Sequence, residues 1–283
     1  MIAFIGMGLL GSNFVKAMLK KGESVQVWNR TAAKATALEA DGAKAFDNVA
    51  DAVRGASVIH ITLKDDGVVN EVLEQARAGF APGVTIIDHT TTSAHGAAER
   101  TELWKGRGYT YVHAPVFMGP QNALESTGTM LVSGDQEIVK RITPQLEKMT
   151  GKVMNFGTEN NKAAGIKLIG NLFLIALTAG VADTLALGTA IGVTPAEVST
   201  LFDSWNPVAM LPARLKKITS GRFEQPSWEL DMARKDAGLM IDGAARGNRH
   251  LMAIPAIAAE MDKWIAKGFG GYDWTVIGRD SVE

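Results

Sequence analysis

The segment from Met1 to Gly11 constrains the fold more than any other part of the chain. The apolar run Ile2–Ile5 leads directly into Gly6-Met7-Gly8-Leu9-Leu10-Gly11, after which the spacing of apolar residues predicts a helix over residues 10–21. In such a strand–turn–helix unit, the first glycine permits a tight turn, the second leaves its space to a bound group, and the third lets the helix pack on the strand. The segment therefore predicts the first unit of a parallel α/β sheet.

The rest of the chain divides into two halves with different patterns. Up to about residue 160, β-branched runs alternate with helical patterns, which is typical of a parallel sheet. The predicted strands cover residues 24–28, 57–61, 84–87 and 153–156, and the predicted helices cover 32–40, 67–78 and 136–149. Beyond residue 160, Ala, Leu, Met and Gly recur at helical spacing through residues 161–191, 195–203, 228–246 and 255–267. We therefore predict an α/β chain, with a Rossmann-type doubly wound parallel sheet in residues 1–160 and an all-α domain in residues 161–283.

The glycine turn also predicts a ligand. A pyrophosphate placed against it would meet the N-terminus of the helix, where unpaired amides and the helix dipole attract anions, so a dinucleotide is expected. The second predicted strand ends in Asn29-Arg30-Thr31, without the acidic residue that would accept hydrogen bonds from a ribose 2′-hydroxyl. Because Arg30 can form a charge-assisted fork with a 2′-phosphate and Thr31 can add a donor, we predict NADP(H) in preference to NAD(H). The alternative is that Arg30 is a solvated charge and Thr31 is only the N-cap of the next helix.

Composition excludes several other kinds of function. A net charge of −1, with Lys and Arg spread along the chain, gives no basic stripe for nucleic acid. The chain has no cysteine, and its five histidines show no metal-ligand spacing, so we expect neither a cysteine nucleophile nor a metal site. Cysteine usage and an N-terminus without leader character fit a cytoplasmic protein.

The most apolar stretch, Leu168–Ala182, predicts a buried helix rather than a membrane span. It holds 15 residues between Lys167 and Asp183, whereas a span needs about 20. Small residues punctuate the same helix, so another helix, or its copy in a second subunit, could approach its backbone closely. These residues are Gly165, Gly170, Ala176, Gly180 and Ala186. We therefore expect a homodimer formed through the helical domain, and no membrane partner.

Several motifs follow one another in a characteristic order along the chain. They are Gly6–Gly11, Asp88-His89-Thr90-Thr91, Ala114-Pro115-Val116, the stretch from Gly165-Ile166-Lys167 to Asn171, and Lys235-Asp236. In this combination the chain resembles, over essentially its whole length, the β-hydroxyacid dehydrogenase family, which includes 3-hydroxyisobutyrate dehydrogenase, and more distantly the imine reductases. The resemblance implies a dinucleotide-binding sheet domain, a long helix leading into an all-helical domain, and subunits associated through the helical half.

The resemblance also implies further cofactor residues. Leu63 would line the cofactor cleft, and Thr91 and Lys235 would lie near the cofactor. Taken alone, Thr91 is equally well explained as the N-cap of a helix over residues 95–104. The residues predicted to bind the dinucleotide are therefore Gly6, Met7, Gly8, Leu10, Gly11, Asn29, Arg30, Thr31, Leu63, Thr91 and Lys235.

Lys167 and Asn171 are the predicted catalytic pair. Because they are four residues apart on a helix, they project from one face and can reach one substrate oxygen. When a carbonyl is reduced, its oxygen becomes alkoxide-like, so an ammonium beside it stabilises that charge and donates a proton. Asn171 would hold the lysine or the substrate oxygen. Without the neighbouring motifs, the pair would instead be interpreted as a snorkelling charge and a satisfied core amide.

The predicted substrate wall departs from the family pattern. Phe117-Met118-Gly119 stands where the family usually has Ser-Gly-Gly, whose hydroxyl and amides hold a substrate carboxylate. A Phe and a Met make this wall bulkier, more apolar and poorer at binding a carboxylate. Trp228 stands where the family often has Phe. We predict that Phe117, Met118, Gly119 and Trp228 bind the substrate.

The sequence thus predicts an NADPH-dependent oxidoreductase that reduces an aldehyde or ketone of the β-hydroxyacid or semialdehyde class, with Lys167 as general acid and base. An imine reductase is the nearest alternative, because the apolar wall favours it while Lys167 favours carbonyl chemistry. A dinucleotide-binding sensor that has kept the fold without turnover is the alternative outside enzymes.

Overall fold

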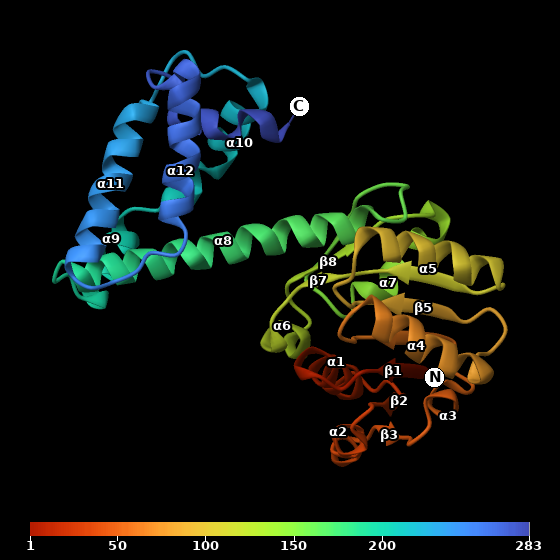
Figure 1. Cartoon of the computed structure of the whole chain (residues 1–283). Coiled ribbons are helices and arrows are strands. Elements are labelled where there is room, and N and C mark those ends of the chain that lie inside the picture. The colour runs from red at the N-terminus through yellow and green to blue at the C-terminus, as the bar shows by residue number, and fades with distance from the viewer. Residues whose placement is uncertain (283) are drawn as a thin grey trace. The chain divides into compact units, whose positions relative to one another are not determined.

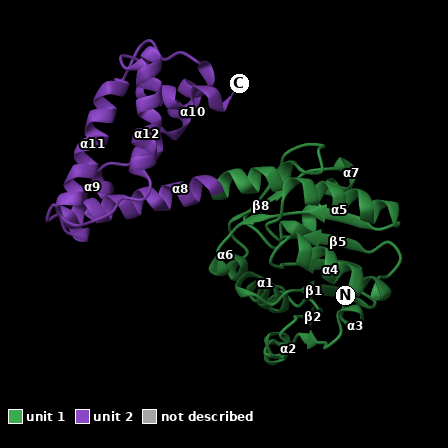
Figure 2. Cartoon of the chain, viewed as in Figure 1, with its two compact units in different colours: residues 1–171 green, residues 172–283 purple. Residues whose placement is uncertain are grey.

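The structure is a computed structural model that describes residues 1–282. The chain forms two compact units, Met1–Asn171 and Leu172–Glu283, which are drawn in green and purple in Figure 2. Helix α8, Lys162–Ala190, runs through the boundary and contributes to both units. The predicted catalytic pair on α8 therefore belongs to the unit that contains the sheet.

The first unit is built on a parallel sheet whose strand order, within residues 1–282, is β3-β2-β1-β4-β5-β6 (Figure 1). Its strands are β1 (Ile2–Ile5), β2 (Val25–Trp28), β3 (Lys44–Ala45), β4 (Val58–Ile61), β5 (Thr85–Asp88) and β6 (Thr110–His113). Strand β1 pairs in parallel with β2 on one side and with β4 on the other. The direction of winding therefore reverses between β1 and β4, and ligands of such sheets bind beyond the carboxyl ends of the strands at this point. The predicted doubly wound sheet is confirmed.

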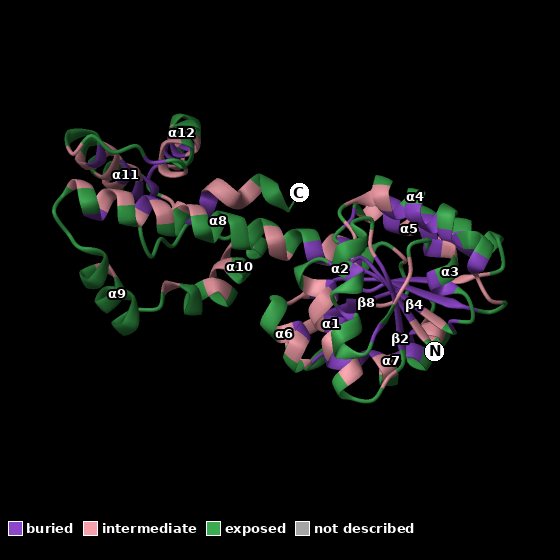
Figure 3. Ribbon diagram, turned by 90° about the horizontal axis from the view of Figure 1, so that it is seen from below, coloured by how far each residue is buried: buried purple, intermediate pink, exposed green. Residues whose placement is uncertain are grey.

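Helices cover both faces of this sheet, because successive strand residues alternate between two cores. They are α1 (Leu9–Lys20), α2 (Ala32–Thr36), α3 (Val49–Val53), α4 (Asp66–Ala76), α5 (Ala94–Gly106), α6 (Pro120–Glu125) and α7 (Gln136–Leu146). In β1, Phe4 packs in one core with Phe14 of α1, whereas Ile5 packs in the other with Ile59 of β4. Figure 3 shows the central strands as buried. Burial on both faces explains why these strands are nearly continuous apolar runs in the sequence.

A smaller sheet within the described chain consists of β7 (Val116–Phe117), β8 (Thr129–Val132) and β9 (Lys152–Asn155). Strand β7 runs antiparallel to β8, and β9 runs parallel to it. The sequence predicts β9 but neither β7 nor β8, and it also misses β3 and β6 of the main sheet. Because β3 and β7 are two residues long, they are too short to produce a periodic pattern.

The second unit is helical, as predicted. Besides its part of α8 it contains α9 (Pro195–Ser204), α10 (Leu211–Ser220), α11 (Leu230–Arg246) and α12 (Ile254–Trp264). Its core joins Leu230 and Ala233 of α11 to Met261 and Trp264 of α12. This unit therefore has a hydrophobic core of its own.

The carboxylate of Asp183 joins α8 to the start of α12. It accepts hydrogen bonds of 2.7, 2.9 and 3.0 Å from the backbone amides of Met252, Ala253 and Ile254. Burial alone would raise the pKa of Asp183, but these three amides lower it below its usual value. The contacts make Asp183 the cap of the α12 N-terminus, supplied from a distant part of the chain.

Helix α8 matches the helix predicted over residues 161–191, but it is more exposed than the sequence predicts. Among residues 1–282 it is the one helix that is long and apolar enough to cross a membrane, because it has 29 residues and its most apolar 18-residue window has a mean hydropathy of 1.8. Of its most apolar window, 6% is buried within the chain, and Leu172 and Ile175 are each 70% exposed. The prediction of a buried helix is therefore wrong for the single chain, because hydropathy reports how apolar a helix is and not what covers it. In folded proteins, a continuous apolar surface of this kind is typical of interaction sites.

Candidate functional site

The predicted cofactor residues of the first unit follow the strands of the main sheet. Gly6–Gly11 follows β1, Asn29–Thr31 follows β2, Leu63 follows β4, and Thr91 follows β5. Because these strands are parallel, their carboxyl ends lie at the same edge, on both sides of the winding reversal between β1 and β4. The topology therefore brings the turn and the loops to one edge of the sheet.

The three glycines of the turn have different surroundings. Gly6 has a φ of +98°, and a Cβ there would lie 2.0 Å from the carbonyl oxygen of Thr62. A Cβ at Gly11 would lie 2.0 Å from the carbonyl oxygen of Gly6. Helix α1 can therefore approach the turn this closely only because residue 11 is a glycine. At Gly8, by contrast, a Cβ would meet no heavy atom of residues 1–282 within 4 Å. Because Gly8 is the N-cap of α1, this open space adjoins the first helical amides, which fits a bound pyrophosphate.

Two threonines to which the sequence assigns no role hold this turn in place. Thr62 Oγ1 donates a hydrogen bond of 2.7 Å to the carbonyl oxygen of Gly6. Thr90 Oγ1 accepts one of 2.9 Å from the amide of Leu63, and the Thr90 amide donates one of 2.8 Å to Asp88 Oδ1. Leu63 Cδ2 lies 3.1 Å from a Cβ built on Gly6, so Leu63 packs against the turn. A single threonine produces no periodic pattern in the sequence. Only its position shortly after a predicted strand could have indicated that Thr62 or Thr90 has a role at this edge.

The loop after β2 is tied to the glycine turn by Asn29. Its Oδ1 accepts a hydrogen bond of 2.9 Å from the amide of Met7, and its Nδ2 donates one of 2.9 Å to the carbonyl oxygen of Thr31. Arg30 and Thr31 are both exposed. Thr31 is the N-cap residue of α2, but within the described chain its hydroxyl makes no capping hydrogen bond. The hydroxyl and the guanidinium therefore face solvent at this edge.

Lys167 and Asn171 lie together on α8, as their spacing predicts. Lys167 Nζ donates a hydrogen bond of 2.9 Å to Asn171 Oδ1. The same ammonium lies 4.3 Å from the centre of the Phe117 ring, a favourable cation–π geometry. Lys167 is 9% exposed, and burial lowers the pKa of its ammonium. The ammonium is thus held against Phe117 and Asn171 instead of extending into bulk water.

Phe117 reaches α8 through a space left by Gly170. A Cβ built on Gly170 would lie 2.3 Å from Cζ of the Phe117 ring, so the ring occupies the place of a side chain. Gly170 therefore serves packing within the chain and not the approach of a second helix, which corrects part of the predicted contact surface. Gly165 and Gly180, by contrast, border open space within residues 1–282.

The rest of the predicted substrate wall continues from β7 into α6. Met118 is half-buried and packs on the core of the first unit, and its Cγ lies 2.8 Å from a Cβ built on Gly128. Gly119 is the exposed N-cap of α6, and its amide donates a hydrogen bond of 2.9 Å to Asn122 Oδ1. Within this wall, Phe117 is the residue that contacts Lys167.

Thr91 is exposed and does not cap a helix. The N-cap of α5 is Ser93, whose hydroxyl accepts a hydrogen bond of 2.9 Å from the amide of Gly96. The alternative interpretation of Thr91 as an N-cap is therefore wrong. Capping does not account for a threonine at this position.

Two predicted site residues lie in the second unit. Lys235 is exposed on α11, with its Nζ 2.9 Å from Asp236 Oδ1. Trp228 is 39% exposed, and its ring centre lies 5.7 Å from that of Trp274. Their assignment to the cofactor and the substrate stays a prediction.

Comparison with known proteins places these features in a family context. The family described as the NAD binding domain of 6-phosphogluconate dehydrogenase matches residues 1–157. The 2-(hydroxymethyl)glutarate dehydrogenase of Eubacterium barkeri is 26% identical over 281 residues, which cover 98% of this chain and 93% of that protein. The 3-sulfolactaldehyde reductase of Escherichia coli strain K12 is 28% identical over 285 residues, which cover 98% of this chain and 94% of that protein.

A solved structure shares the whole fold. The imine reductase of Myxococcus stipitatus in complex with NADP+ matches with a TM-score of 0.90 and 21% identity, covering 98% of each chain. At this identity the likeness establishes the fold, a Rossmann-type sheet unit followed by helices.

Proposed function

Since this chain belongs to the family of the NAD-binding domain of 6-phosphogluconate dehydrogenase and is an NAD(P)-dependent oxidoreductase, we propose that it reduces an aldehyde or ketone with NADPH. Its type is that of the hydroxyacid dehydrogenases and imine reductases, and the resemblance to the β-hydroxyacid dehydrogenases is confirmed. The observation that carries the carbonyl proposal is the buried Lys167 Nζ, held 2.9 Å from Asn171 Oδ1. The nicotinamide, when bound, supplies the hydride.

Lys167 donates the proton in this proposal. Burial lowers the pKa of its ammonium, so Lys167 gives up a proton more readily than a lysine in water does. Asn171 Oδ1 takes one of the three N–H donors and fixes the position of Nζ, which leaves the others for the substrate oxygen. In the direction of oxidation, the neutral amine accepts the proton from the alcohol.

The dinucleotide is proposed to bind at the carboxyl edge of the main sheet. The open space at Gly8 supports this placement, because it adjoins the N-terminus of α1. The residues proposed to hold the dinucleotide are Gly6, Met7, Gly8, Leu10, Gly11, Asn29, Leu63, Thr91 and, from the second unit, Lys235. Arg30 and Thr31 are proposed to bind a 2′-phosphate, which makes NADP(H) the preferred cofactor.

The cofactor preference is tested at Arg30. The Arg30→Ala variant should lose at least tenfold in kcat/KM with NADPH and little with NADH, because a charge-assisted fork is lost only with the phosphate-bearing cofactor. Arg54→Ala is the matched control, since Arg54 is an exposed arginine of the same unit that pairs with Asp51. An unchanged NADPH/NADH ratio in Arg30→Ala contradicts the assignment.

The substrate is proposed to be an aldehyde or ketone of the β-hydroxyacid or semialdehyde class, and the residues proposed to bind it are Phe117, Met118, Gly119 and, from the second unit, Trp228. Phe117 places an aromatic face beside Lys167 and supplies no hydrogen-bond donor for a carboxylate. The same aromatic face favours a second candidate, imine reduction, because a ring that attracts an ammonium also attracts an iminium ion. Lys167 distinguishes the two reactions, since an iminium ion is repelled by an ammonium next to it.

The reaction is tested with a substrate panel. Aldehydes, ketones, keto acids and cyclic imines are each assayed by nicotinamide absorbance with NADPH. Lys167→Ala should lower kcat for a carbonyl substrate about a hundredfold to ten-thousandfold while NADPH still binds. Lys162→Ala, at the exposed start of the same helix, is the control and should keep normal turnover. Near-normal turnover in Lys167→Ala, or turnover of imines alone, would overturn the carbonyl proposal.

The predicted helical domain, residues 161–283, is proposed to supply the substrate and dimer surfaces. We propose that a second copy of this chain packs against the exposed apolar face of α8. Leu172 and Ile175 are exposed on this helix and would contribute to the interface. A copy is favoured over a bilayer because the uncharged run between Lys167 and Asp183 has 15 residues, so that a span of roughly 20 residues through α8 would bury at least one of these charged side chains.

A further inference from the structure

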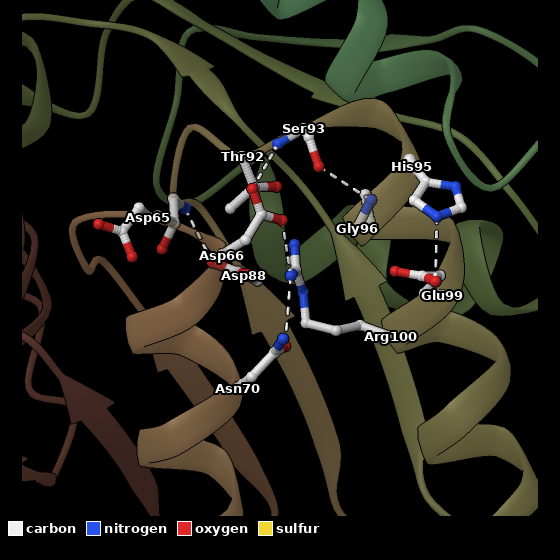
Figure 4. Close-up of polar contacts among 12 residues, drawn as sticks. Asp65, Asp66, Asn70, Asp88, Thr92, Ser93, His95, Gly96, Glu99 and Arg100 are labelled. Carbon is white, nitrogen blue, oxygen red and sulfur yellow. Dashed lines mark hydrogen bonds and ion pairs between the residues drawn. The ribbon is translucent and has the colours of Figure 1, made fainter.

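Arg100, on α5, is a buried cation that the proposed chemistry does not use. Its side chain is 2% exposed, and its guanidinium donates hydrogen bonds of 2.7 Å to Asp66 Oδ1 and 2.9 Å to the Tyr111 hydroxyl. Figure 4 shows it extending from α5 toward Asp66 and Asn70 of α4. Burying a guanidinium is costly, and an apolar side chain of similar size often serves stability equally well. The contacts of Arg100 therefore point to a role in geometry.

One branch of these contacts joins the beginnings of two helices. Asp66 lies in the first turn of α4, and its Oδ2 accepts a hydrogen bond of 2.9 Å from the amide of Ser93, the N-cap of α5 (Figure 4). A Cβ at Gly96 would lie 2.0 Å from Asp66 Oδ1, so the carboxylate reaches this place only because residue 96 is a glycine. Arg100 and Asp66 thus fix the start of α4 against the start of α5.

The other branch passes through the interior to the cofactor edge. The buried Tyr111 hydroxyl accepts from Arg100 and donates a hydrogen bond of 2.7 Å to Asp88 Oδ2. Asp88 Oδ1 accepts from the Thr90 amide at 2.8 Å, and Thr90 Oγ1 accepts from the Leu63 amide at 2.9 Å. The chain of contacts ends on the residue that packs against the glycine turn.

We propose that Arg100 and Tyr111 are positioning residues that fix the loops 62–65 and 89–93 at the dinucleotide-binding edge. The inference rests on the proposed function, because it assigns these loops to the cofactor. Both branches end on loops that follow neighbouring strands, β4 and β5, at the winding reversal or next to it. Neither Arg100 nor Tyr111 touches the cofactor in this proposal, and their effect passes through Ser93 in one branch and through Thr90 and Leu63 in the other.

A second arginine provides a matched comparison within the same pair of helices. Arg107, the C-cap of α5, pairs with Glu74 of α4 at 2.6 Å. It therefore links the same two helices, but at their opposite ends, away from the loops that precede them. If an α4–α5 ion pair served only to hold the helices together, both arginines would have the same effect on ligand binding.

The test compares Tyr111→Phe, Thr90→Val and Arg107→Gln with the unmodified protein. Tyr111→Phe keeps the ring and removes only the hydroxyl that joins Arg100 to Asp88, while Thr90→Val cuts the last link to Leu63. Binding of NADPH is followed by its fluorescence, thermal unfolding by circular dichroism, and KM for NADPH and kcat are measured with any active substrate. We expect the NADPH Kd and KM to rise about tenfold in Tyr111→Phe and in Thr90→Val, with kcat at saturating NADPH changing less than threefold. Arg107→Gln should stay within twofold in all three quantities.

The outcomes separate this inference from the proposed function. If the unmodified protein binds neither NADPH nor NADH, the proposed function fails. If it binds NADPH and either Tyr111→Phe or Thr90→Val binds it within twofold of the unmodified protein, only the positioning role is overturned. Unfolding of Tyr111→Phe under conditions where the unmodified protein stays folded would also overturn it, because the hydroxyl would then serve the stability of the whole unit.

Discussion

The two units of this chain differ in how they cover their apolar surfaces and buried charges. In the first unit, both faces of the sheet carry a core, and a buried cation such as Arg100 finds its partner Asp66 within the unit. In the second unit, the core lies between α11 and α12, while apolar side chains of α8 such as Leu172 are exposed. The first unit therefore completes its interior within one chain, whereas the second leaves apolar side chains exposed, and the proposed dimer rests on this surface.

The largest effect is expected on α8. Leu172→Glu places a carboxylate on the proposed interface, where burial without a partner costs several kcal/mol, so the dimer Kd should rise about a thousandfold. The mass in solution is measured by light scattering after size exclusion. Leu103→Glu is the control, because Leu103 is an exposed leucine of the first unit and should leave the mass unchanged. The dimer proposal is contradicted if the unmodified protein, Leu172→Glu and Leu103→Glu all have the same mass in solution.

A second test uses the glycine turn of the first unit. Gly11→Ala should destabilise folding by about 3 kcal/mol, because its Cβ would lie 2.0 Å from the carbonyl oxygen of Gly6. Gly8→Ala should change stability by less than about 0.5 kcal/mol but weaken NADPH binding at least tenfold, because its Cβ would enter the open space beside α1. Urea unfolding and NADPH titration measure the two effects. Equal stability losses in both variants would contradict the assignment of that space to a ligand.

Acid should loosen the first unit through a buried pair of histidines. His60 Nδ1 lies 2.9 Å from His89 Nε2, and burial lowers the pKa of both, that of His89 to about 4. In the unfolded chain these histidines have pKa values near 6.5, so between about pH 6.5 and 4 the unfolded chain binds protons that the folded chain does not. The free energy of unfolding therefore falls as the pH falls through this range. His89 alone should account for roughly 3 kcal/mol of this loss.

Urea unfolding at a series of pH values measures the loss. His89→Asn should reduce the dependence between pH 6.5 and 4 without abolishing it, because burial also lowers the pKa of His60. His95→Gln should preserve the dependence, because His95 is exposed beside Glu99. If the free energy of unfolding of the unmodified protein does not change between pH 6.5 and 4, the two histidines are protonated as readily in the folded chain as in the unfolded chain.

The smallest effect is expected within the second unit. Asp183→Ala removes the acceptor for the amides at the start of α12 and should destabilise the protein by about 1–2 kcal/mol. Thermal unfolding measures the loss, and Asp203→Ala, at an exposed position on α9, is the control. No change in Asp183→Ala would mean that water caps α12 equally well.

The sequence predicts some parts of the site and misses others for a consistent reason. The spacing of Gly6, Gly8 and Gly11 predicts the turn because it expresses local sterics between a strand and the next helix. The sequence does not predict strand β6, because its Tyr111 and His113 are polar and their hydrogen-bond partners come close only in the folded unit. The sequence also does not predict the exposure of α8, because an apolar helix has the same sequence pattern whether it packs against its own chain or against another one.

The amino-acid sequence is sufficient to predict the N-terminal strand–turn–helix, the division into a sheet half and a helical half, and the pairing of Lys167 with Asn171. These features depend on residues close together in the chain, where backbone geometry fixes which side chains meet. Two other contacts became visible in the folded chain: Phe117 lies against Gly170 and Lys167, and Arg100 reaches Asp66 across 34 positions of the chain. Such contacts depend on how whole elements pack, and the pattern within any one element does not encode them.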